Sequence, residues 1–297
     1  MSSEKLFLLG VGCQKGGTTW LHDQLSKSNN FDGGLFKEYH VFDCLHIEPC
    51  INIKEPLIQQ LKEINNLNIN SPNTLGILMH NLFFSNPDSY FDYFDYLWLS
   101  KKSTKIVGDI TPSYCGLDSK VFQTIRKKLE ERGFRVKIVF LMRDPVERIH
   151  SMFRMKKRDL SKSNEISSEI IRISEDEFMK KKYKEVNVEF RTRYDKTILN
   201  LESAFDEENI FYSLYEDLFS DECISRLSKF LEIDSKIFDK SQFSNVSPRK
   251  EFLREETISL VANYYSEVYS FVEQRFDIST KWKSYKYVSR SNLKYVL

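Results

Sequence analysis

A glycine-rich stretch near the start of the chain carries residue types suited to binding phosphate or sulfate. It contains Lys15, Gly16, Gly17, Thr18, Thr19 and Trp20. The glycines let the backbone approach a ligand without a Cβ clash, and successive N–H groups at a helix N-terminus can surround an anion. The lysine adds a positive charge and the threonines add hydroxyl donors. The stretch therefore predicts an anion-binding loop, and the alternative is a glycine-rich turn with a solvated lysine.

The order of residues in this loop differs from that of the ATP-binding P-loop. In the P-loop motif, the lysine follows the last glycine and directly precedes Ser or Thr. Here Lys15 precedes the pair Gly16 and Gly17. A phosphotransferase built on a variant P-loop stays open as an alternative function, and it would require Mg²⁺.

A second candidate anion site centres on Arg143, which follows an apolar run. Pro145 suits the first turn of a helix, and Ser151 lies about two turns into that helix. An arginine fork and a hydroxyl together can hold a terminal phosphate, and Arg148 shares the helix face of Ser151. The alternative is an ion pair between Arg143 and Asp144 above a solvated helix face.

Apolar runs alternate with helical patterns along the chain, which is typical of an α/β domain with a parallel sheet. We predict strands over residues 5–11, 31–36, 105–110, 136–142 and 209–214. We predict helices over residues 18–28, 74–99, 118–133 and 258–276, and another from residue 145. In the helix after Asp118, Val121, Ile125 and Leu129 form the apolar stripe. The glycine loop should lie at the carboxyl end of a parallel sheet, and Arg143, where a predicted strand ends, should project over the sheet edge.

These elements predict one α/β domain over residues 1–297, with a P-loop-like parallel central sheet flanked by helices. Residues 154–186 interrupt the pattern with many charged side chains, including Arg154, Arg158 and Lys180–Lys182. We interpret this stretch as a partly helical insertion. It is either a lid that contacts an anionic acceptor or a solvated segment.

Charge and cysteine content exclude several function classes. The chain has 44 Lys and Arg against 43 Asp and Glu, so no overall charge attracts nucleic acid or an anionic membrane. No segment has about 20 uninterrupted apolar residues, so no membrane span is predicted. The five cysteines form no CxxC pair or metal-ligand spacing, which indicates free thiols and a cytoplasmic protein. A disulfide between Cys44 and Cys50 in a secreted protein is the alternative.

Two motifs resemble those of sulfotransferases that use 3′-phosphoadenylyl sulfate (PAPS). Residues 15–20 resemble the 5′-phosphosulfate loop of that family, and residues 143–153 resemble its 3′-phosphate motif, in the same order along the chain. Residues 37–43 resemble the Lys-Glu-x-His-Phe-Phe segment of the heparan sulfate and bacterial carbohydrate sulfotransferases. Residues 108–114 resemble their Gly-Glu-x-Ser/Thr-Pro-x-Tyr turn. Tyr39 stands where many relatives have Pro, and Asp109 where they have Glu.

The resemblance implies a role for each part of the candidate site. Lys15 and the loop would bind and stabilise the phosphosulfate, and Arg143 and Ser151 would hold the 3′-phosphate. Arg249, in a basic loop near the C-terminus, is a possible closing contact. Glu38 would be the catalytic base, with His40 as a positioning residue and rival base. The acceptor would be a glycan or another small molecule, and no metal is implied. A nucleotide-binding module without catalytic activity remains a further alternative.

Overall fold

The computed structural model describes residues 4–63, 71–162, 169–242 and 251–289. Its core is a parallel sheet of five strands in the order β2-β3-β1-β4-β5. In chain order the strands are β1 (Lys5–Gly12), β2 (Phe31–Asp32), β3 (Ile106–Ile110), β4 (Phe134–Met142) and β5 (Ile210–Leu214). All four neighbouring pairs are parallel. The predicted α/β architecture with a parallel central sheet is therefore confirmed.

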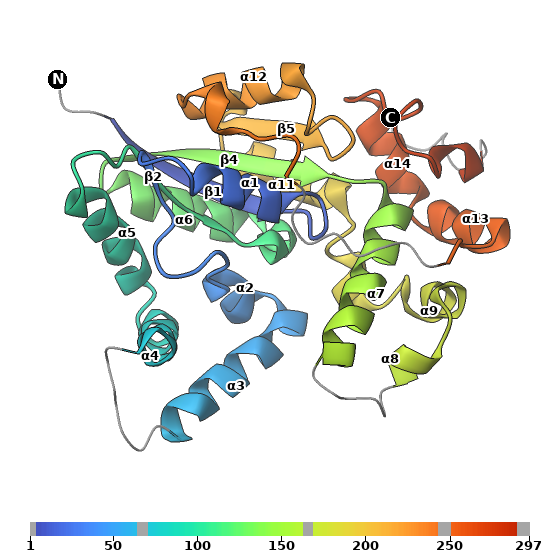
Figure 1. Cartoon of the computed structure of the whole chain (residues 1–297), viewed down its shortest axis with the longest axis horizontal. Coiled ribbons are helices and arrows are strands. Elements are labelled where there is room, and N and C mark those ends of the chain that lie inside the picture. The colour runs from blue at the N-terminus through green and yellow to red at the C-terminus, as the bar shows by residue number, and fades with distance from the viewer. Residues whose placement is uncertain (1–3, 64–70, 163–168, 243–250, 290–297) are drawn as a thin grey trace.

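Fourteen α-helices are described around this sheet (Figure 1). The first seven are α1 (Thr18–Leu25), α2 (Val41–His46), α3 (Glu48–Glu63), α4 (Pro72–Ser85), α5 (Asp88–Ser100), α6 (Ser119–Glu130) and α7 (Pro145–Lys162). The others are α8 (Glu169–Arg172), α9 (Glu175–Lys182), α10 (Val186–Glu189), α11 (Tyr194–Ala204), α12 (Asp221–Leu231), α13 (Glu255–Tyr264) and α14 (Ser266–Glu273). Short 3₁₀ helices include η1 (Pro112–Gly116) and η2 (Glu207–Asn209).

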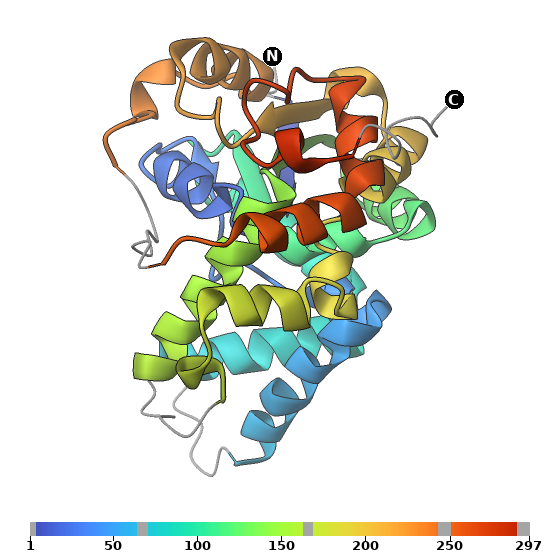
Figure 2. The ribbon, with the colours of Figure 1, turned by 90° about the vertical axis from the view of Figure 1, so that its right-hand side faces the viewer.

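Alternate residues of the strands contribute to two separate hydrophobic cores, because successive side chains of a strand point to opposite faces of the sheet. On one face, Leu6 and Leu8 of β1 pack with buried residues of α1 and α12. On the other face, Phe7 and Leu9 pack with residues of α5, α6 and α11. Figures 1 and 2 both show α3, α4 and α8 extending below the sheet, as a helical region on one side of it.

Parallel strands direct their carboxyl ends to one edge of the sheet, and the segments that follow them gather there. The glycine loop follows β1 at Gly12, and Arg143 follows β4 directly. Residues 33–40 follow β2, and Thr111 follows β3. The predicted placement of the glycine loop and of Arg143 at the ends of their strands is confirmed.

Several predicted boundaries are wrong for identifiable reasons. The second strand ends at Asp32 instead of residue 36, because the chain turns at Gly34, whose φ is 70°. The predicted helix over 74–99 is two helices, α4 and α5, separated at Asn86 and Pro87. The first helix ends at Leu25 rather than residue 28.

Two predictions of amphipathic helices also need correction. The helix over 258–276 is broken into α13 and α14 at Tyr265, which has φ −96° and ψ 20°. Its spacing hid the break because residues of both helices bury against the same core. In α6, Asp118 caps the helix as predicted, accepting a hydrogen bond from the Val121 N–H at 2.9 Å. Phe122 occupies the buried stripe there, while Val121 is only half-buried.

The charged stretch 154–186 begins within an element that was already predicted. Residues 154–162 form the second half of α7, and α8 and α9 follow within the described residues. This part is therefore continuous with the helix that carries Ser151. No described helix has the length and apolar character needed to cross a membrane. All five cysteines are buried and free, which confirms the free thiols and excludes the Cys44–Cys50 disulfide.

Candidate active site

The glycine loop between β1 and α1 is shaped by two residues in the left-handed region. Lys15 has φ 70° and Gly17 has φ 99°, and a Cβ on Gly17 would lie 2.4 Å from Leu218 Cδ2. The loop is tied to β4 by the Cys13 N–H, which donates to the Leu141 carbonyl. No side chain caps the start of α1, so its first N–H groups can bind an anion.

Lys15 lies in a positively charged environment at this loop. Burial lowers the pKa of its ammonium group, and the nearby Arg158 and Arg143 lower it further, to about 8. Within the described residues, Lys15 Nζ has no hydrogen-bond or ion-pair partner. Arg154 adds to the same field, and Asp159 opposes it. Because cations outnumber carboxylates around Lys15, a bound anion would be stabilised there.

Arg143 lies against the loop, a contact that the sequence did not predict. Its Nη1 donates to the Lys15 carbonyl at 3.1 Å, its guanidinium stacks 4.4 Å from the ring centre of Tyr215, and Nη2 lies 3.7 Å from Glu147. Its Nε is buried and has no hydrogen-bond partner among the described residues. Arg143 therefore keeps a donor available at the sheet edge.

The alternative interpretation of Arg143, an ion pair with Asp144, is wrong. Asp144 is buried and accepts hydrogen bonds from the N–H of Ser284 and the hydroxyl of Tyr269, both at 2.9 Å. Asp144 also accepts from the Val146 N–H at 3.0 Å. This carboxylate anchors the C-terminal segment to the start of α7 and leaves Arg143 free to face the loop.

The other predicted phosphate contacts lie along α7 or outside the described residues. Ser151 is buried two turns into α7. Arg148 is fully buried, and its Nη2 donates to the Val188 carbonyl at 3.2 Å, so it holds α10. Arg249 lies outside the described residues.

Trp20 is placed within the core instead of in an open site. Its ring lies 5.1 Å from Phe219 and 5.6 Å from Phe238, measured between ring centres. Its indole N–H donates to the Asp239 carbonyl at 3.2 Å. Trp20 thus fixes α1 against the segment that follows α12.

A second group of charged side chains lies after β2 and centres on Glu38. Lys37 Nζ lies 2.5 Å from Glu38 Oε1, and His40 Nε2 lies 3.2 Å from Glu38 Oε2. The other ring nitrogen of His40, Nδ1, lies 2.7 Å from Asp43 Oδ2. Asp43 is buried and also accepts a hydrogen bond from the Ser113 hydroxyl. The imidazole is therefore held between two carboxylates.

The turn after β3 positions this group. The Tyr39 N–H donates to Thr111 Oγ1 at 2.8 Å, a bond that the Pro of many relatives would lack. Asp109 is fully buried and accepts hydrogen bonds from the hydroxyls of Thr111, Tyr90 and Tyr114. The segments 37–43 and 108–114, which the sequence singled out separately, are thus one structural unit.

The ionisation of this group separates the two candidate bases. Burial alone would lower the pKa of His40, but its hydrogen bonds to Asp43 and Glu38 outweigh burial and raise the pKa to about 10. Burial alone would raise the pKa of Glu38, but hydrogen bonds with His40 and Lys37 lower it to about 2. At neutral pH, His40 therefore carries both ring protons and cannot accept another, whereas Glu38 is ionised.

The sequence patterns assigned no role to three residues of the candidate site, one beside His40 and two that follow β5. Asp43 follows His40 by three residues at the start of α2. Tyr215 follows β5 directly, so the rule that sites gather at carboxyl strand ends would have indicated it. Glu216 accepts from the Trp282 indole N–H at 3.1 Å, and burial raises its pKa to about 7. No sequence pattern that we considered indicated Glu216.

Arg143→Ala is expected to weaken binding of 3′-phosphoadenosine 5′-phosphate. Loss of a hydrogen bond to a charged group costs about 2 kcal/mol, roughly thirtyfold in Kd. Isothermal titration calorimetry against the wild type measures this change. Arg132→Ala, which removes an arginine that pairs with Asp92 on α5, is the control. Unchanged nucleotide affinity in Arg143→Ala would remove Arg143 from the site.

Activity at low donor concentration is expected to fall as the pH rises through about 8. Lys15 is protonated below its pKa of about 8 and loses its charge above it, and kcat/KM reports ionisations of the free enzyme. Measurement of kcat/KM for the donor between pH 6 and 10 checks this. In Lys15→Arg the alkaline decline should move above pH 10, because arginine stays protonated. An identical decline in that variant would assign it to another group.

Comparison with known proteins gives the following matches. The family model described as "Sulfotransferase domain" matches residues 118–285, which is more than half of the chain. No curated protein matches the chain in sequence. A sulfotransferase from Alicyclobacillus acidocaldarius has a similar structure with a TM-score of 0.57 and 16% identity, over 91% of this chain and 95% of that chain.

Two further solved structures match at lower TM-scores. The sulfotransferase domain of the Synechococcus PCC 7002 olefin synthase has a TM-score of 0.43 and 16% identity, over 88% of this chain and 94% of that domain. The sulfotransferase STF9 from Mycobacterium avium has a TM-score of 0.44 and 12% identity, over 90% of this chain and 76% of that protein. At 16% identity, the first match shows a shared fold. The other two structures have TM-scores below 0.5 and support no conclusion about this chain.

Proposed function

Since the chain belongs to the sulfotransferase domain family, we propose that it transfers a sulfuryl group from PAPS to a hydroxyl or amine acceptor on a carbohydrate. The observation that carries this proposal is that three segments follow the carboxyl ends of strands in one parallel sheet, two of which, the glycine loop and Arg143, are in contact. These are the glycine loop with Lys15, the Arg143 segment, and the segment that carries Glu38. The first two supply positive charge, and the third supplies an ionised carboxylate.

The residues of this edge fit a donor with two anionic ends. Arg143 Nε has no partner among the described residues, Lys15 adds a positive charge at the loop, and the N-terminus of α1 is uncapped. The loop and Lys15 would hold the phosphosulfate, while Arg143 and Ser151 would hold the 3′-phosphate. When bound, PAPS supplies the sulfuryl group and leaves as 3′-phosphoadenosine 5′-phosphate.

Each residue has a defined task in the proposed reaction. Glu38 would accept the proton of the acceptor hydroxyl while the new bond from oxygen to sulfur forms. Lys15 and the loop N–H groups would stabilise the negative charge that develops on the leaving phosphate oxygen. His40 and Lys37 would orient the Glu38 carboxylate and keep it ionised, so they are positioning residues. The hydrogen bonds from His40 and Lys37 also make Glu38 a weaker base. Its contribution to the rate therefore depends on its placement beside the acceptor hydroxyl.

The main alternative, a variant P-loop phosphotransferase, differs in its metal requirement. Kinase-type transfer relies on Mg²⁺ to bridge the phosphates, whereas the proposed reaction uses Lys15, Arg143 and backbone N–H groups. Turnover of PAPS is therefore expected to continue in excess EDTA, measured as release of 3′-phosphoadenosine 5′-phosphate. A strict requirement for Mg²⁺ with ATP as the donor would indicate the phosphotransferase instead.

A further inference from the structure

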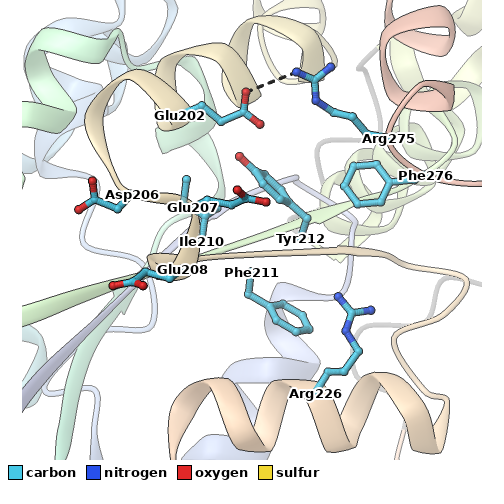
Figure 3. A pocket seen from close by; sticks show the side chains of 10 residues that line it. All are labelled: Glu202, Asp206, Glu207, Glu208, Ile210, Phe211, Tyr212, Arg226, Arg275 and Phe276. Atoms are coloured by element: carbon cyan, nitrogen blue, oxygen red, sulfur yellow. Dashed lines mark hydrogen bonds and ion pairs between the residues drawn. The ribbon is translucent and has the colours of Figure 1, made fainter.

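A groove of about 790 Å³ lies beside the first residues of β5, Ile210 to Tyr212 (Figure 3). The candidate active site lies beyond the last residues of the strands, so the groove is a separate surface. We call it the β5 edge groove. Besides these three residues, its lining includes Glu207, Glu208, Arg226 and Arg275.

The groove exposes an open sheet edge. β5 is the last strand of the sheet order and pairs with β4 on one side. Within the described part of the chain, no strand pairs with its other side. The side of β5 that carries the groove is therefore not covered by a neighbouring strand.

Acidic side chains lie at one end of this edge and arginine side chains at the other. Glu207 and Glu208, just before β5, are exposed and form no ion pair among the described residues. Further along, Arg226 of α12 lies 5.3 Å from the ring centre of Phe211. Figure 3 shows Arg226 on the Phe211 side of the strand and Arg275 on the Tyr212 side.

The two arginines are available to a binding partner. Arg226 is exposed and forms no ion pair in the described part of the chain. Arg275 lies 3.4 Å from Glu202, both on the surface. Exposed ion pairs of this kind contribute little stability, so Arg275 can exchange its partner at small cost.

We propose that the β5 edge groove binds a second copy of this chain, with the two β5 edges antiparallel about a two-fold axis. A two-fold axis makes one surface contact itself, so every contact occurs twice. Antiparallel packing reverses the order of charges along the facing edge. Glu207 and Glu208 of each copy then face the Arg226 and Arg275 region of the other, and the axis passes between Asn209 and Ile210. This places the start of β5 in one copy against η2 of the other, so the contact is made by side chains and does not extend the sheet.

This charge order favours a second copy over an unrelated extended peptide. The other two carboxylates of the groove, Asp206 and Glu202, pair with Arg126 and Arg275 of their own copy. The remaining acidic pair, Glu207 and Glu208, and the arginines occupy opposite ends of the same short edge, so the surface is complementary to itself in the reversed direction. The association should weaken with added salt, because the contacts lie between exposed charges. Sedimentation equilibrium should show a molar mass that rises with protein concentration from 35.2 kDa toward twice that value.

Two charge-reversed variants test the proposal. The first is Glu207→Arg with Glu208→Arg, and the second is Arg226→Glu with Arg275→Glu. In each variant alone, like charges meet across the axis, and the dissociation constant of the dimer should rise about tenfold or more. An equimolar mixture restores both contacts, so it should form a mixed dimer. Reversal of the α6 pair, Lys127→Glu with Glu131→Arg, is the matched control and should leave self-association unchanged.

A cysteine near the axis gives an independent test. The native cysteines are all buried, so Asn209→Cys would add a thiol next to its own copy. Mild oxidation should yield a cross-linked dimer in low salt and little in high salt. The proposal is overturned if the wild type stays at 35.2 kDa at every concentration, or if mixing the two reversed variants restores nothing. PAPS turnover is measured separately, so either result leaves the proposed function untouched.

Discussion

Glu38→Gln is expected to lower kcat about a hundredfold or more, while nucleotide affinity stays near that of the wild type. Gln keeps the size of the side chain and can still accept a hydrogen bond from Lys37 or His40. It cannot take up the acceptor proton. Steady-state kinetics with saturating donor and acceptor measure the loss, and calorimetry with 3′-phosphoadenosine 5′-phosphate measures the affinity.

Two comparisons make this result specific to the role of Glu38. Glu131→Gln removes an exposed carboxylate just after α6 that pairs only loosely with Lys127, at 3.9 Å, and should leave kcat unchanged. His40→Ala should lower kcat less than Glu38→Gln does, because His40 acts by orienting Glu38. If Glu38→Gln kept full activity and His40→Ala lost it, His40 would be the base.

Lys15→Ala is expected to lower kcat by about a hundredfold to a thousandfold, the usual effect of removing one group that stabilises a developing oxyanion. The positive charge of Lys15 is most needed when the leaving phosphate oxygen gains negative charge. Nucleotide affinity should fall by a smaller factor, since Arg143 and the loop N–H groups still bind the anion. Single-turnover kinetics separate the two effects.

Lys27→Ala is the control for this substitution. Lys27 lies just beyond α1 and donates to Gln24 Oε1 at 2.8 Å. Loss of its side chain should therefore change neither kcat nor the nucleotide affinity. Lys15→Arg should recover part of the rate because it restores the charge. A Lys15→Ala enzyme with normal kcat and weak donor binding would show that Lys15 only binds the donor.

Much of the fold could be predicted from local patterns. Buried parallel strands appear as apolar runs, and the glycine loop and Pro145 mark the starts of α1 and α7. Asp118 marks the start of α6, because its side chain accepts the capping hydrogen bond from the Val121 N–H. Because parallel strands align their carboxyl ends, the placement of the glycine loop and of Arg143 at strand ends also followed from the sequence, but their direct contact did not.

The remaining features depend on contacts between distant segments. His40 looked like a possible base because its unperturbed pKa suits that role. Its actual ionisation is set by the buried Asp43 and by Glu38 together. Trp20 was expected near the ligand, but Phe219 and Phe238, about 200 residues away in sequence, enclose it. Periodicity could not reveal the break at Tyr265, because the helices on both sides of it bury the same face.

The glycan acceptor in the proposal rests on the resemblance of residues 37–43 to the matching segment of the carbohydrate sulfotransferases. The residues around Glu38 define where an acceptor proton is taken up, but an amine and a hydroxyl make the same demand there. The nearby Arg154 and Arg158 of α7 contribute positive charge beside Lys15. The acceptor must therefore be found by assay of several chemical classes.

Transfer of ³⁵S from labelled PAPS is the most direct test of the central claim. The wild-type protein is incubated in EDTA with glycans, peptides and small alcohols, and labelled product is separated from donor. The account predicts labelled product with at least one acceptor, by far the most with a glycan, and almost none with Glu38→Gln or Lys15→Ala. Label that stays on the donor with every acceptor, under conditions where 3′-phosphoadenosine 5′-phosphate binds, would contradict it and indicate a nucleotide-binding module without sulfotransferase activity.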